Sequence, residues 1–64
     1  MMNRNEIKTA AESIACGVFD RGGSLDQAEV EISRAFADDT ASDRELALGF
    51  ARRWLAAVQD VPGN

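Results

Sequence analysis

The chain of 64 residues has no histidine and no tyrosine, and Cys16 is its single cysteine. The absence of an imidazole excludes the common general base near neutral pH, the Ser-His and Cys-His nucleophiles, and histidine-containing zinc sites. A single cysteine forms neither an internal disulfide nor a cysteine-cluster metal site, so Cys16 is expected to be a free thiol in a reducing compartment. We therefore expect no metal, no other cofactor and no enzymatic activity.

Long apolar runs are also missing. The polar start of the chain, residues 1–8, leads into no apolar stretch of signal-peptide length, and no apolar run reaches the roughly 18 residues of a membrane span. This pattern predicts a cytoplasmic protein that has no membrane partner.

Large apolar side chains are few. Alanine accounts for 11 of the 64 residues, and larger aliphatic, methionine, phenylalanine and tryptophan side chains together number 17. A folded chain of this size buries only about 60% of the surface that its unfolded form exposes. Because the core is small, we expect association with a second copy or with a larger partner.

Proline occurs once, at Pro62, and predicts a frayed tail over residues 62–64 after a single helical domain over residues 1–61. Polar interruptions at residues 20–24 and 38–42 divide that domain. The first contains glycine where a helix ends in the left-handed conformation. Capping-box patterns then mark the helix starts, at Ser24 with Gln27, at Ser42 with Glu45 and, more weakly, at Asn3 with Glu6. These signals predict helices over residues 4–20, 25–37 and 43–60.

Apolar residues recur at helical spacing in all three segments. The expected core stripes are Ile7, Ala10, Ala11, Ile14 and Val18, then Leu25, Ala28, Ile32, Ala35 and Phe36, then Leu46, Ala47, Phe50, Trp54, Ala57, Val58 and Val61. Short linkers favour antiparallel neighbours. The sequence therefore predicts an all-α fold, a small up-down-up three-helix bundle.

The third segment has more apolar surface than one stripe requires, because Leu48, Ala51 and Leu55 widen its arc to about 200°. Either this helix is central and packs on both others, or these residues form a seam for a second chain. The second possibility describes a self-associating structural or assembly module, a homodimer. Val30 and Ala37 lie opposite the core stripe of the second segment and raise the same question.

Two further features of the third segment have alternative interpretations. Gly49 either allows another helix to approach closely or is a tolerated helix glycine. Arg52, Arg53 and Trp54 resemble an element that grips phosphate and stacks on bases, but the spacing places Trp54 in the core stripe. With Trp54 in the core stripe, Arg52 is expected to project to solvent. Arg53 is expected to border the core, within reach of a carboxylate from another helix.

Negative charge is concentrated between residues 26 and 45, where seven acidic and two basic residues give a local net charge of −5. This surface can dock on a basic protein by presenting carboxylates where phosphates would lie. The alternative is that the acids solvate an exposed face and stabilise the start of the third helix. The candidate contact residues are Glu29, Glu31, Asp38, Asp39 and Asp43.

Metal and DNA binding both fit the sequence poorly. Residues 38–45 lack the ligand spacing and the glycine of a calcium-binding EF-hand loop. The second and third segments can be drawn as a helix-turn-helix, but the would-be recognition helix opens with Asp43, Arg44 and Glu45. With a net charge of −4, the chain lacks the counterion-release term that provides most DNA affinity. We expect no direct nucleic-acid partner, and a DNA-binding regulator is the least favoured function.

Small size and acidity favour an interaction protein that regulates or inhibits a larger protein through its acidic surface. In size and charge the chain resembles the inhibitors that phages and mobile elements make against host-defence or nucleic-acid machinery. Self-association through the third helix is the alternative, and the two are compatible because a dimer presents two acidic faces.

Overall fold

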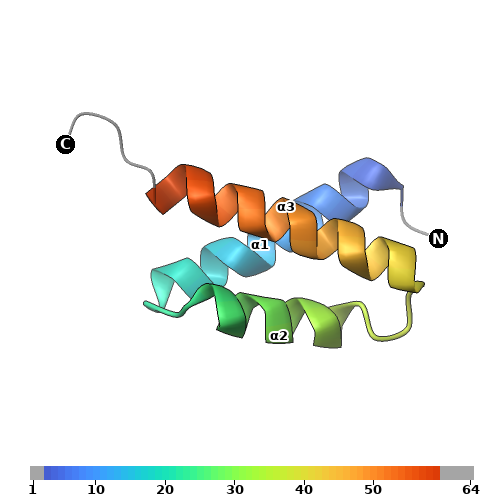
Figure 1. The fold of residues 1–64 in the computed structure, drawn as a ribbon, viewed down its shortest axis with the longest axis horizontal. Coiled ribbons are helices and arrows are strands. Elements are labelled where there is room, and N and C mark those ends of the chain that lie inside the picture. The colour runs from blue at the N-terminus through green and yellow to red at the C-terminus, as the bar shows by residue number, and fades with distance from the viewer. Residues whose placement is uncertain (1–2, 60–64) are drawn as a thin grey trace.

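The computed structural model describes residues 3–59, which form three α-helices. Helix α1 spans Arg4–Asp20, α2 spans Leu25–Ala35 and α3 spans Ala41–Gln59. Figure 1 shows α1 and α3 running in the same direction, with α2 antiparallel to them. The all-α, up-down-up three-helix bundle predicted from the sequence is confirmed.

The helix bounds follow the prediction closely, with two differences. α1 matches residues 4–20, whereas α2 ends at Ala35 instead of residue 37 and α3 begins at Ala41 instead of residue 43. The predicted end of the third helix at residue 60, the core position Val61 and the tail over residues 62–64 lie outside the described residues. Within residues 3–59, no helix combines the length and apolar character needed to cross a bilayer.

The helix starts show which capping signals form. The Asn3 side chain accepts the Glu6 backbone N–H at 2.9 Å, and the Glu6 carboxylate accepts the Asn3 backbone N–H at 3.0 Å. The box with the weakest sequence signal is therefore complete. At α2 only half of the predicted box forms, with Ser24 Oγ accepting the Gln27 N–H at 3.4 Å.

The predicted cap at Ser42 is wrong, because α3 starts earlier. Thr40 Oγ1 accepts the Asp43 backbone N–H at 3.2 Å, and the Thr40 carbonyl accepts the Arg44 N–H at 3.0 Å. Thr40 supplies the same kind of hydroxyl cap as Ser42, two positions nearer the loop. The earlier start keeps Asp43 within the first turn, where the helix dipole favours a carboxylate.

Two glycines form the sharp turn between α1 and α2. Gly22 has a φ of +74°, the left-handed conformation that the sequence predicts for this helix end. The Gly22 N–H donates to the Phe19 carbonyl at 3.0 Å and the Gly23 N–H to the Val18 carbonyl at 2.8 Å, the pair of bonds of a Schellman motif. A Cβ on Gly23 would lie 2.6 Å from Val18 Cγ1, so the turn packs directly on the core.

All three helices contribute to one core, in which alanine is the commonest residue. Alanine at the contacts lets helix axes approach closely. α3 packs against both α1 and α2, and its contact with α1 is the most extensive in the bundle. The buried residues are Ile7, Ala11, Ala15, Val18, Ala28, Ile32, Phe36, Ala47, Phe50, Ala51 and Leu55.

The buried face of α3 differs from the predicted stripe. Ala51 and Leu55 are 0% and 3% exposed, whereas Trp54 is only half-buried and Ala57 is exposed. The physical reason is that α3 packs on two helices, so its buried arc extends toward the Ala51 and Leu55 side. On α2, Leu25 and Ala35 were also expected in the core but are exposed.

The turn geometry predicts that Gly22→Ala and Gly23→Ala each destabilise the protein. The first change should cost about 1–2 kcal/mol through left-handed strain, and the second about 1–3 kcal/mol through overpacking against Val18. Thermal or urea unfolding of the purified variants measures both effects. Gly17→Ala is the matched control, because Gly17 lies inside α1 and a Cβ there would have no neighbouring atom within 4 Å, so the change should be neutral or stabilising. Unchanged stability in both turn variants would contradict this account of the turn.

Candidate interaction surface

The five acidic residues proposed from the sequence all reach the molecular surface, but they fall into two groups. Asp38 is exposed, and the other four are half-buried. Asp38 and Asp39 lie in the loop between α2 and α3, and Asp43 lies in the first turn of α3. We refer to these three residues as the loop acids. Glu29 and Glu31 lie along α2.

Glu29 and Glu31 point to opposite flanks of α2 and have partners within the chain. Glu29 accepts from Arg52 of α3 at 2.8 Å, whereas Glu31 pairs with Arg21, the C-cap residue of α1. Residues two apart on a helix are separated by about 200°, which accounts for the different partners. The structure therefore does not bring all five acids onto one face.

The position of Arg52 corrects a prediction. The sequence placed Arg52 in solvent and Arg53 within reach of a carboxylate; the Arg52 side chain is indeed 56% exposed, but Arg52 makes the ion pair. The cause is the same shift of the buried arc of α3, which brings Arg52 beside α2. Because both side chains of the Arg52–Glu29 pair remain partly exposed, the pair adds little to stability.

The loop acids lie near the start of α3 and are not part of α2. α2 ends at Ala35, and the Asp39 N–H donates to the Phe36 carbonyl at 3.1 Å as the chain turns. The Arg44 guanidinium donates to the Asp39 backbone carbonyl at 3.3 Å. Among residues 3–59, none of the three carboxylates of the loop acids has an ion-pair partner. Their negative charge is therefore available to an external cation.

A shallow apolar groove between α2 and α3 adjoins the loop acids. Val30, Ala37 and Leu48 are its apolar residues, and Val30 is 54% exposed. The sequence identified Val30 and Ala37 on the second segment and Leu48 on the third, and the fold brings them together. Its polar lining recurs at helical spacing along α2 and consists of Asp26, Glu29, Ser33 and Arg34, of which the sequence assigned only Glu29 to a site. We call this feature the α2–α3 groove.

The proposed self-association seam is divided between core and surface. Ala51 and Leu55 are buried within the core of this chain, so they present no surface to a second copy in this conformation. Leu48 is half-buried and lines the α2–α3 groove. The wide apolar arc of α3 is thus explained, at Ala51 and Leu55, by packing on two helices.

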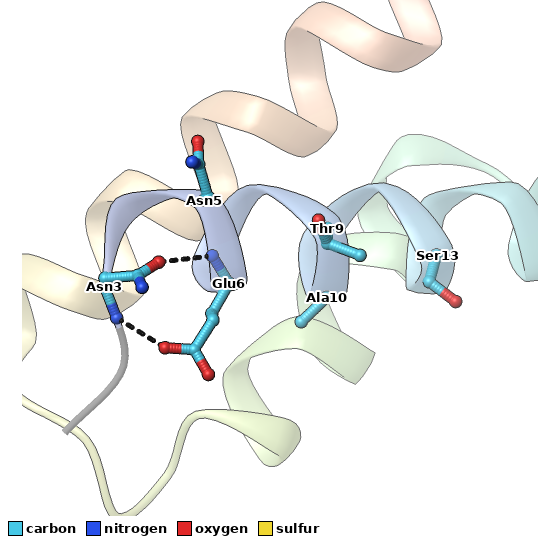
Figure 2. Close-up of a pocket in the computed structure, with 6 residues that line it drawn as sticks. All are labelled: Asn3, Asn5, Glu6, Thr9, Ala10 and Ser13. Carbon is cyan, nitrogen blue, oxygen red and sulfur yellow. Dashed lines mark hydrogen bonds between the residues drawn. The ribbon is translucent and has the colours of Figure 1, made fainter.

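Two smaller features lie elsewhere. Figure 2 shows a hollow along α1, where Asn3 and Glu6 bond reciprocally and Asn5, Thr9, Ala10 and Ser13 complete the lining. One helix provides all of these residues, and the capping box uses two of its polar side chains. Near one end of the bundle, Phe19 and Trp54 meet edge to face with ring centroids 6.1 Å apart.

A hollow between α1 and α3 contains Gly49. The Arg4 guanidinium lies 5.5 Å from the centroid of the Phe50 ring beside it, a cation–π distance. A Cβ on Gly49 would have no neighbouring atom within 4 Å. Nothing within residues 3–59 therefore requires glycine at this position. In residues 3–59, no group of three or more histidine, cysteine, aspartate or glutamate side chains is placed to hold a metal ion.

Leu55→Ala should destabilise the monomer by about 2–5 kcal/mol, because it opens a cavity in the core. Leu48→Ala, at a half-buried position, should cost less. Urea unfolding at two protein concentrations measures both changes. If the chain used these residues as a dimer seam, the loss for Leu55→Ala would instead depend on protein concentration, and this result would contradict the core assignment.

Gly49→Ala should stabilise the protein by up to about 1 kcal/mol, because alanine has the higher helix propensity and the hollow has room for a methyl group. The melting temperature measures the change. A loss of stability would show that the space beside Gly49 is filled in solution, and would contradict the open geometry.

Comparison with protein-family models, with curated proteins and with solved structures found no match for this chain. A three-helix bundle does not by itself specify an activity, because function depends on the site that a fold presents. The loop acids and the α2–α3 groove are therefore the basis for a functional proposal.

Proposed function

We propose that this protein is a non-enzymatic interaction module that binds a larger protein with a basic surface and regulates or inhibits it. The observation that carries the proposal is the α2–α3 groove beside the loop acids. Ala37 lines the groove and is followed in the chain by Asp38 and Asp39, so apolar and acidic contacts adjoin.

This combination suits protein recognition for two reasons. Apolar contacts in a groove supply affinity when they are desolvated, and exposed charges increase the association rate and select the partner. The loop acids have no ion-pair partner within the described residues, so a cation from the partner does not need to displace an internal one. Glu29 and Glu31 are paired with arginines, and we assign them a secondary role.

The proposed partner has a surface rich in lysine and arginine, as the phosphate-binding groove of a nucleic-acid-handling protein does. In size and charge the chain resembles the inhibitors that phages and mobile elements make against host-defence or nucleic-acid machinery. A cytoplasmic location is consistent with the free, exposed thiol of Cys16.

Reversing the loop charge tests the proposal. Asp38→Lys/Asp39→Lys should weaken binding to the partner by at least tenfold, about 1.4 kcal/mol, because like charges then face each other. The partner is first captured from a cell lysate and identified by mass spectrometry, and the purified partner is then titrated with each variant. Glu12→Lys/Asp20→Lys is the matched control, since it reverses two charges on α1, away from this surface.

The salt dependence supplies a second readout. Affinity for the wild-type protein should fall as ionic strength increases, because exposed charges are screened beyond about 8 Å at physiological salt. Binding that depends neither on salt nor on the loop reversal would contradict the proposal. Equal weakening by the α1 control would assign the effect to net charge and would also contradict it.

A further inference from the structure

We propose that the α2–α3 groove takes an amphipathic helix of the partner, which packs apolar side chains on Val30, Ala37 and Leu48 and directs lysine or arginine toward the loop acids. The inference rests on the proposed function and adds the chemistry of the bound segment. It follows from the shape of the groove, from its apolar surface and from the charge beside it.

The shape of the groove fits a helix. Its lining on α2 runs from Asp26 to Arg34, which at 1.5 Å per residue is about 12 Å or two helical turns, and Ala37 of the following loop and Leu48 of α3 complete it. A helix laid along such a groove contacts it through residues at i, i+3 or i+4, and i+7. A fourth helix at this position would also complete a four-helix arrangement from the three-helix bundle.

The apolar contacts are available in the free protein. Val30 is the most exposed of the large hydrophobic residues that reach the surface in the described part of the chain. Leu48 belongs to the layer of partly buried residues packed on the core, so a helix seated on it would extend that core outward. Burial of these side chains provides the hydrophobic gain of docking.

The charge distribution selects a cationic helix and gives it a direction. The three loop acids have no ion-pair partner within residues 3–59 and adjoin the Ala37 end of the groove, whereas the other end has the single carboxylate of Asp26. The Glu29 carboxylate between them is already paired with Arg52. Arg34 lies one turn before Ala37 and offsets part of this charge, so lysine or arginine is favoured at the end of the bound helix that extends beyond Arg34 to the loop acids. A segment with its cations clustered at one end matches this pattern.

The same charges disfavour a second copy of this chain as the occupant. Each copy has a net charge of −4. Ala51 and Leu55 would have to contribute to a self-association surface on α3, but they are buried within the core of a single chain. A basic segment of another protein complements the surface, and a second acidic chain does not.

A synthetic peptide tests this inference without knowledge of the partner. The probe is an amphipathic helix of about 14 residues built from leucine, alanine and lysine, with leucine on one face and the lysines clustered toward one end. One control peptide has the same composition in scrambled order, and another has glutamate in place of lysine. Titration of the isotopically labelled protein, followed by amide NMR shifts, locates the contact and measures the affinity.

The amphipathic probe should shift the amides of Val30, Ala37, Leu48 and the loop acids, and it should bind at least roughly fivefold more tightly than either control peptide. Val30→Ser should weaken binding of the probe by a similar factor. Leu25→Ser is its matched control, because Leu25 is also exposed, at 37%, but does not line the groove. Asp38→Asn/Asp39→Asn should weaken binding, and Glu12→Gln/Asp20→Asn should not.

The other outcomes separate the inference from the function on which it rests. If the shifts are confined to the loop acids and the scrambled peptide binds equally well, the helix-in-groove inference is overturned. The proposed binding to a protein with a basic surface is then still supported. If the glutamate peptide binds as tightly as the lysine peptide, the inference that the bound helix is cationic is overturned. Groove shifts that grow with protein concentration in the absence of peptide would identify a second copy and overturn the inference. Failure of every cationic peptide to bind would overturn both proposals.

Discussion

Helix α3 packs against both other helices, and this packing holds the bundle together. A chain with so few large apolar side chains cannot give each pair of helices a separate core. Ala47, Phe50, Ala51 and Leu55 of α3 therefore meet the apolar stripes of α1 and α2 in one shared cluster. The alanines in that cluster allow close approach of the helices, and the larger residues fill the space between them.

This central position also determines what remains on the surface. Turning Ala51 and Leu55 into the core brings Arg52 beside Glu29 of α2 and leaves Leu48 at the edge of the α2–α3 groove. α2 is short, and its buried residues Ala28 and Ile32 lie on one side, so Val30 faces outward. The groove is thus a by-product of how three helices share a small core, and the adjoining loop gives it an acidic end.

The electrostatic pattern is more local than the net charge indicates. Between residues 26 and 45 the sequence carries a net charge of −5, yet Glu29 and Glu31 are paired with arginines from outside that interval. Asp38, Asp39 and Asp43 have no ion-pair partner within the described residues, and they lie where α2 has ended and α3 begins. An external cation therefore meets its strongest unpaired charge at the loop and less along α2. The functional proposal rests on this distribution.

The helical class, the number and order of the helices and most of their bounds follow from the amino-acid sequence alone. These depend on local physics: apolar spacing at 3.6 residues per turn, side-chain caps such as Asn3 and Ser24, and a left-handed glycine at residue 22. The same local rules predict the start of α3 two residues too late, because Thr40 and Ser42 offer equivalent hydroxyl caps. The packing of the three helices establishes which side of α3 is buried and which arginine meets Glu29. It also brings Val30, Ala37 and Leu48 to one groove. Those outcomes depend on how the helices rotate and pack against one another, and the spacing of residues within one helix does not specify that rotation.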